Sequence, residues 1–123
     1  MAQELTINAS MVYADSEDSS ESFSIEDFIG NVTTKKYIKA KVSVGTSEEA
    51  IPLGEVTTLG WAGFRNRDAT NYVEIRSASG SANDIIKIPP GGVALFHFGS
   101  DVTAPYWIAN TAACQCEYFI VNT

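Results

Sequence analysis

Apolar and polar residues alternate along much of the chain in short runs. From Leu5 to Tyr13 every odd position is apolar, and polar residues fill most positions between them. This period of two is typical of a strand with one buried face. Residues Tyr37–Val44 alternate in the same way. The pattern predicts a strand over each range, with Lys39 and Lys41 of the second facing water or a partner.

Further strand-like runs follow at a spacing of about 8 to 12 residues, which is typical of a sandwich or barrel. Turn-forming residues separate them, as in Pro89–Gly92, because proline fixes φ and glycine accepts a positive φ. We therefore expect an all-β fold: one antiparallel β-sandwich domain over residues 1–123, jelly-roll-like, with about eight or nine strands. The additional strands are expected at Ala50–Thr57, Gly60–Asn66, Tyr72–Ser77, Asp84–Ile88, Val93–Phe98, Tyr106–Asn110 and Cys114–Val121.

The composition also favours strands over helices. Ile, Val and Thr supply 11, 9 and 10 residues, whereas Leu supplies four, and β-branched side chains pack well on pleated sheets. The length of 123 residues suits a single domain. Apolar runs such as Tyr118–Val121 are far shorter than the roughly 20 residues of a membrane-spanning helix. The first residues lack the regions of a secretory signal, so we expect synthesis in the cytoplasm.

The net charge of −7 is concentrated in the first thirty residues. They hold seven of the fifteen acidic residues and no Lys or Arg, so the rest of the chain is neutral, with eight charges of each sign. An acidic balance argues against a nucleic-acid partner, which would require a basic face. Asp15–Ser22 contains no apolar residue and is expected to be an exposed loop. Its carboxylates lack the glycine and the glutamate spacing of an EF-hand calcium loop.

Four lysines follow this acidic segment closely along the chain. Two interpretations stay open: the two charged segments are solvated faces, or they contact a partner subunit. The residues assigned to the second interpretation are Asp15, Glu17, Asp18, Lys35, Lys36, Lys39 and Lys41.

Two late runs, Val93–Phe98 and Tyr118–Val121, carry apolar side chains at both alternating positions. An antiparallel sheet in a monomer usually leaves one face to water. A second subunit would cover such a face, so we expect a homo-oligomer. The residues expected at or near its interface are Phe96, Phe98, Phe119 and Val121.

Residues suited to catalysis or metal binding are scarce. His97 is the single histidine and lies in an apolar run, which is more typical of a structural or interfacial imidazole than of a general base. Cys114 and Cys116 share one strand face, where a mutual disulfide would be strained. With one histidine they fall short of a zinc ligand set. We therefore expect buried free thiols, no metal, no cofactor and no catalytic site.

The aromatic pair Tyr106 and Trp107 has two open interpretations. Exposed rings near a sheet edge would form a ligand platform that stacks on sugars, whereas rings on the strands of a small sandwich are more often part of the core.

Four segments together resemble a known group of proteins. They are Gly60–Ile75, with the turn Asn-x-Asp-Ala-Thr-Asn at Asn66–Asn71, then Lys87–Gly92, Thr103–Pro105 and Asn110–Ala113. The chain from about Lys35 to Val121 resembles small structural proteins encoded among the virion genes of tailed bacteriophages. The resemblance implies an oligomeric capsid decoration (cement) protein on the virion surface, with a trimer favoured. The major capsid protein is the implied partner, and the acidic and lysine-rich segments named above are the residues expected to contact it. Neighbouring alternatives are a tail, fibre or baseplate component, or a carbohydrate- or receptor-binding module of the virion.

Overall fold

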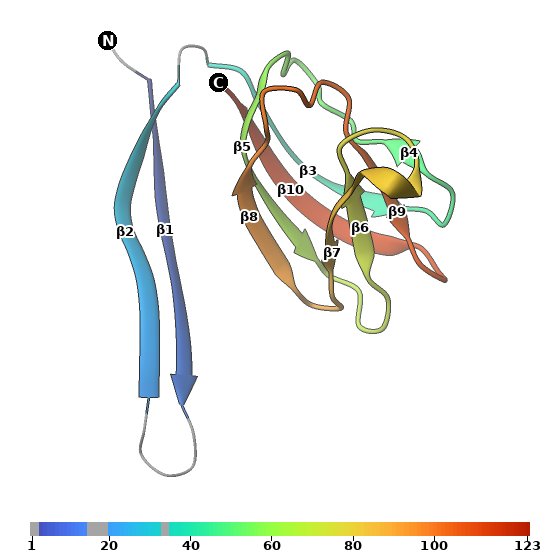
Figure 1. Cartoon of the computed structure of the whole chain (residues 1–123), viewed down its shortest axis with the longest axis horizontal. Coiled ribbons are helices and arrows are strands. Elements are labelled where there is room, and N and C mark those ends of the chain that lie inside the picture. The colour runs from blue at the N-terminus through green and yellow to red at the C-terminus, as the bar shows by residue number, and fades with distance from the viewer. Residues whose placement is uncertain (1–2, 15–19, 33–34) are drawn as a thin grey trace. The chain divides into compact units, whose positions relative to one another are not determined.

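The computed structural model describes residues 3–14, 20–32 and 35–123, which fall into two compact units, 1–34 and 35–123. The first unit is a hairpin of two long antiparallel strands, β1 (Gln3–Ala14) and β2 (Ser20–Val32) (Figure 1). In the described part of the chain, no helix is long and apolar enough to cross a membrane.

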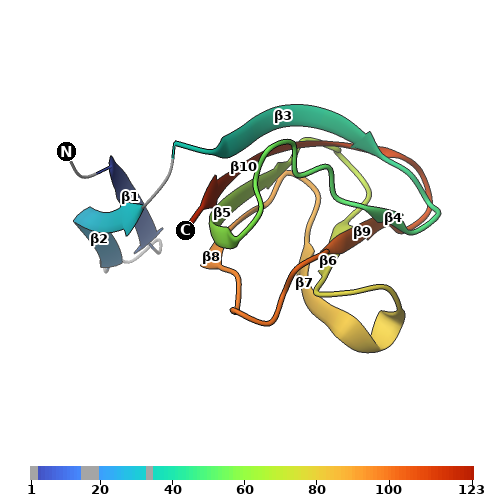
Figure 2. The ribbon, with the colours of Figure 1, turned by 90° about the horizontal axis from the view of Figure 1, so that it is seen from above.

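The second unit is a sandwich of two four-stranded antiparallel sheets, seen as two layers in Figure 2. One sheet has the strand order β3-β10-β5-β8, and the other has the order β4-β9-β6-β7. A short 3-10 turn, η1 (Ser81–Asn83), precedes β7. The strands are β3 (Tyr37–Val44), β4 (Glu49–Ala50), β5 (Leu59–Asn66), β6 (Val73–Arg76), β7 (Asp84–Ile88), β8 (Val93–His97), β9 (Tyr106–Ala109) and β10 (Cys114–Asn122).

Alternate side chains of both sheets fill the space between them. Trp107 of β9 is completely buried and meets the ring of Tyr118 of β10 edge-on, with 5.2 Å between ring centroids. Phe64 of β5 stacks on the same tyrosine at 6.0 Å. These rings join the two layers, since Trp107 belongs to one sheet and the other two belong to the opposite sheet. Other fully buried side chains are Val44, Val73, Ile75, Ile88, Cys114, Cys116 and Ile120.

The predicted all-β sandwich is confirmed. Its sheets do not extend over the whole chain, and most of the expected strand Ala50–Thr57 is not a strand. The sheets of the sandwich comprise residues 37–122, because β1 and β2 form a sheet of their own. Of the expected acidic loop 15–22, residues 15–19 lie outside the described residues. Residues 20–22 already belong to β2.

The expected strand Ala50–Thr57 is wrong beyond its first residue, since β4 ends at Ala50. Pro52 cannot donate to a ladder, and Gly54 turns the chain with a φ of +58°. Ile51 and Val56 are nevertheless buried, so the apolar residues of this segment anchor a loop to the core. The Tyr118 hydroxyl holds that loop by donating to the carbonyl of Pro52 at 2.7 Å.

Two buried asparagines fasten further loops to the ends of strands. The two N–H bonds of the Asn66 amide donate to three carbonyls, those of Asn71, Ile88 and Pro89, with N···O distances of 2.8, 3.2 and 3.2 Å, so one hydrogen is shared. The amide oxygen accepts from the Asp68 N–H at 3.0 Å. The Asn122 side-chain oxygen accepts from the backbone N–H groups of residues 57 and 58 at 2.7 and 3.0 Å. Both side chains replace backbone ladder bonds where the strands end.

The Asn-x-Asp-Ala-Thr-Asn segment is a side-chain-stabilised turn. Its Asp68 carboxylate accepts from the N–H groups of Thr70 and Asn71 at 3.0 and 2.7 Å. These hydrogen bonds lower the pKa of the Asp68 carboxyl. The segment therefore has a structural explanation in the β5–β6 connection.

A charged network on the second sheet joins the loop before β4 to β6, β7 and the η1 turn. The Arg76 guanidinium contacts the carboxylates of Glu48, Glu74 and Asp84 at 2.5, 2.6 and 2.9 Å. Glu48 also accepts from the Ser79 hydroxyl and the Gly80 N–H. Hydrogen bonds from Ser79, Gly80 and Arg76, in that order of effect, lower the pKa of Glu48 from 4.5 to about 2.

The Glu48 network predicts a specific sensitivity to acid. A carboxyl whose pKa is lower in the folded state stabilises the fold above its unfolded pKa, and this contribution is lost as pH falls through the folded value. The melting temperature should therefore fall less steeply between pH 4.5 and about 2 in Glu48→Gln than in the parent. Calorimetry across this range tests the expectation, with the exposed Glu55→Gln as control. Equal slopes in all three proteins would contradict it.

Candidate interaction surface

The outward side of the β3-β10-β5-β8 sheet, here called the outer face, combines apolar and basic side chains. Directly paired residues of neighbouring strands share a face of a sheet. Lys39, Phe119, Gly63 and Leu95 form one such row across the four strands, and Lys41, Glu117, Arg65 and Val93 form the next row.

Large apolar side chains lie exposed on the outer face. Val93 and Tyr37 are 69% and 55% exposed, and Leu95 and Phe119 are 45% and 39% exposed. The rings of Tyr37 and Phe119 stack with centroids 5.6 Å apart, so β3 and β10 present a joint aromatic surface. Contiguous exposed apolar side chains of this kind are typical of interaction sites.

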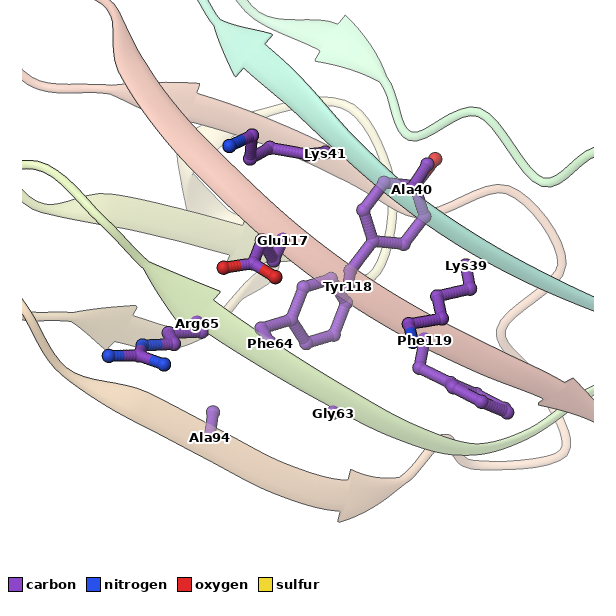
Figure 3. A pocket seen from close by; sticks show the side chains of 10 residues that line it. All are labelled: Lys39, Ala40, Lys41, Gly63, Phe64, Arg65, Ala94, Glu117, Tyr118 and Phe119. Atoms are coloured by element: carbon purple, nitrogen blue, oxygen red, sulfur yellow. The ribbon is translucent and has the colours of Figure 1, made fainter.

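A hollow of about 510 Å³ lies in this surface around Gly63 (Figure 3). A Cβ atom at position 63 would meet no atom within 4 Å, so the glycine leaves open space between Phe119 and Leu95. The hollow is lined in part by Lys39, Lys41, Arg65, Glu117 and Phe119. It can receive a large side chain from a binding partner.

The electrostatic character of the outer face is basic. Lys39, Lys41 and Arg65 project from it, whereas Glu117 is the acidic residue among the lining side chains. The Arg67 guanidinium contacts Glu117 at 2.5 Å. This hydrogen bond, with the nearby charges of Arg65 and Lys41, lowers the pKa of the Glu117 carboxyl. The face therefore favours an anionic partner.

The β1–β2 hairpin has one apolar face and one largely polar face. The pairs Met11–Phe23 and Ala9–Ile25 show that apolar residues of the two strands lie opposite each other. We call this side the hairpin apolar face. Its apolar residues are Leu5, Ile7, Ala9, Met11, Tyr13, Phe23, Ile25, Phe28 and Val32.

A β-bulge keeps the apolar residues of β2 on that face. Glu26 and Asp27 lie opposite the single residue Asn8. Asp27 has a φ of +54°, and its N–H donates to the Asn8 side-chain oxygen at 2.9 Å. The extra residue shifts the alternation by one, so Phe28 points to the same side as Ile25.

Much of the hairpin apolar face is exposed. Met11 and Tyr13 are 73% and 70% exposed, and Phe23 is 62% exposed. A two-stranded hairpin is at best marginally stable in water by itself. The hairpin is also acidic, since residues 1–34 contain no Lys or Arg. It therefore has the chemistry of an arm whose apolar side is buried by a partner.

The residues expected at an oligomer interface separate into two groups. Phe119 lies on the outer face, whereas Phe98 and Val121 are 2% and 8% exposed. Phe96 is half-buried and packs against Phe64 and Phe98, with centroids 5.8 and 4.9 Å apart. Phe98 belongs to the buried core between the sheets, so its placement at an interface is wrong. Val121 is buried, although its pairing with Tyr37 places it on the side of the sheet that carries Phe119. The interface role of the other three residues stays a prediction.

The proposed ligand platform at Tyr106 and Trp107 is likewise corrected. Trp107 is completely buried, and its indole N–H is the one buried side-chain polar atom without a partner among the described residues. Tyr106 is half-buried. Sequence alternation had placed both rings on a strand but could not show that the opposite sheet covers Trp107.

The burial of Trp107 predicts a fluorescence result. In a Trp61→Phe variant Trp107 is the single tryptophan, and its emission should be blue-shifted and several-fold less sensitive to iodide than that of the half-buried Trp61 in a Trp107→Phe variant. Comparison of the two quenching constants tests this. Similar quenching of the two proteins would contradict the burial of Trp107.

The structure also places some of the residues predicted to contact a capsid, and it places His97. Lys35 and Lys36 are exposed just before β3, and Asp15, Glu17 and Asp18 lie outside the described residues. Their proposed contact with a capsid stays a prediction. His97 is exposed on β8, where its Nδ1 lies 2.6 Å from the carbonyl of Phe98 and its ring meets Trp61 edge-on.

Both cysteines are buried free thiols, as predicted. Burial raises the pKa of Cys114, and it raises the pKa of Cys116 to about 12. The described residues include no group of three His, Cys, Asp or Glu side chains placed to hold a metal ion. Comparisons with protein-family models, with curated proteins and with solved structures find no match for this chain.

Proposed function

We propose that this chain is a non-enzymatic structural protein of a bacteriophage virion, an oligomeric decoration protein that cements the capsid shell. The observation that carries the proposal is the uncovered apolar side of the acidic hairpin, next in sequence to a well-packed sandwich. A hairpin of this kind gains stability when a partner covers it. The resemblance to virion proteins, over about Lys35 to Val121, falls on the sandwich unit.

The two units suit the two tasks of a cement protein. The sandwich is held by a packed aromatic core, so it serves as a rigid body. The hairpin and the outer face offer apolar and charged side chains for contacts with other copies and with the major capsid protein. A protein that binds the assembled shell and not the free subunits stabilises the shell by mass action.

The copy number in purified virions tests this proposal. A decoration protein repeats over the capsid surface, so quantitative mass spectrometry should find this chain at hundreds of copies per particle, on the order of the major capsid protein. Removing the gene should leave particles that lose their DNA at a lower temperature. The chain's absence from particles would overturn the virion role. A handful of copies per particle would overturn the cement role and indicate a tail, fibre or baseplate component.

A further inference from the structure

The chain has two surfaces with exposed apolar side chains, and both expose aromatic rings. The hairpin apolar face is a narrow strip of large side chains, with Met11, Tyr13 and Phe23 the most exposed. The outer face of the sheet exposes Tyr37 and Phe119 beside the hollow over Gly63. The hollow leaves room for a projecting ring or thioether of the kind that the hairpin presents.

The hairpin as a whole and the outer face carry opposite charge. Every ionisable side chain of the described hairpin strands that is charged at neutral pH is acidic, namely Glu4, Glu21, Glu26 and Asp27. Glu21, opposite Tyr13, lies on the hairpin apolar face, whereas Glu4, Glu26 and Asp27 lie on the polar side of the hairpin. The outer face presents Lys39, Lys41 and Arg65. Two of these cations, Lys41 and Arg65, lie close enough to Glu117 to help lower the pKa of its carboxyl. Complementary potentials favour association and set its orientation.

Charge also decides between the ways in which two copies can meet. Two hairpins would bring acidic strands together, and two outer faces would bring basic side chains together, so each like pairing is opposed. Only the pairing of a hairpin with an outer face joins opposite charges. Such a contact is head-to-tail, and it generates a closed ring when the rotation between copies permits.

We propose that the hairpin apolar face of one molecule binds the outer face of the β3-β10-β5-β8 sheet of a second molecule, near the hollow over Gly63. The inference rests on the oligomeric part of the proposed function and identifies the surfaces that form the oligomer. In a trimer, each copy donates one hairpin and receives another.

The isolated full chain provides the first test. Sedimentation velocity over a range of concentrations should show reversible association, with a trimer as the closed form, and added salt should weaken it. A strict monomer at every concentration would overturn the inference. It would leave the virion role standing, because copy number per particle is measured independently.

Variants of each surface provide the second test. Phe119→Asp on the outer face and Met11→Asp/Phe23→Asp on the hairpin should each raise the dissociation constant about tenfold or more. Val12→Asp is the matched control for the hairpin, because Val12 is 70% exposed and points away from the hairpin apolar face. Ile85→Asp, at a 42% exposed position of β7 in the other sheet, is the control for Phe119. Circular dichroism and thermal unfolding of each variant establish that it is folded.

Mixing the two defective variants separates head-to-tail contact from the alternatives. The Phe119→Asp protein keeps an intact hairpin, and the Met11→Asp/Phe23→Asp protein keeps an intact outer face. Mixed together, the two proteins should form a 1:1 heterodimer, whereas each protein alone should not associate. Parent-like self-association of the Phe119→Asp protein would indicate hairpin-to-hairpin contact, and parent-like self-association of the hairpin variant would indicate contact between outer faces. Either result, or no complex in the mixture, would overturn the inference.

Discussion

Asn66→Ala is expected to lower the free energy of unfolding by about 4 kcal/mol. The buried side-chain amide donates to three backbone carbonyls, those of Asn71, Ile88 and Pro89, and accepts from the N–H of Asp68. Alanine removes these partners together and leaves a small cavity. A buried polar group without a partner costs about 1 to 3 kcal/mol, so the combined loss exceeds that of an ordinary hydrogen bond. Urea denaturation followed by tryptophan fluorescence measures the change.

A matched asparagine supplies the control. Asn110 is exposed, and its side-chain oxygen accepts one hydrogen bond, from the N–H of Tyr72 at 2.8 Å. Asn110→Ala should therefore cost only about 1 kcal/mol. A similar loss in both variants would show that Asn66 does not link the β5 end to the turns at residues 68–71 and 89–92.

Arg76→Met is expected to destabilise the sandwich by about 3 kcal/mol. The guanidinium satisfies three carboxylates, and the Glu74 side chain is only 7% exposed. Without Arg76, the remaining cation near Glu74 is Lys87, 3.8 Å away and mostly exposed. An incompletely paired buried charge is costly, whereas loss of an exposed ion pair changes stability little.

Two further proteins make this expectation specific. Arg76→Met/Glu74→Met should recover part of the lost stability, since it also removes the buried carboxylate. Arg67→Met is the control, because its pair with Glu117 is about 40% exposed on both sides and should contribute little. If the double variant is as unstable as Arg76→Met, the unpaired buried carboxylate of Glu74 is not the cause of the destabilisation.

Local alternation of residues predicted most strands, but it could not predict the features that depend on the partner strand. Residues Tyr37–Val44 alternate without interruption, and β3 spans that range. Strand β2 was missed because the Glu26–Asp27 bulge shifts its alternation halfway along. The bulge is stabilised by a hydrogen bond to Asn8 on the other strand, so its effect is visible only when the two strands are paired.

The candidate surface shows the same division between local and long-range information. The exposure of Lys39 and Lys41 followed from alternation within β3. Their neighbours Phe119 and Gly63 come from β10 and β5, since the sheet order β3-β10-β5-β8 differs from the order in the chain. The burial of Trp107 depends in the same way on the opposite sheet. Sequence alone therefore identified the strands better than the surfaces that they form.

The position of β10 between β3 and β5 affects how the protein folds during translation. Strands β3 and β5 are synthesised before β10, the strand that separates them, which is the last strand of the described residues. Until residues 114–122 emerge, both strands lack their shared neighbour and expose open edges. The sheet can be completed only after most of the sandwich has been translated, which favours slow folding and a need for protection from aggregation during synthesis.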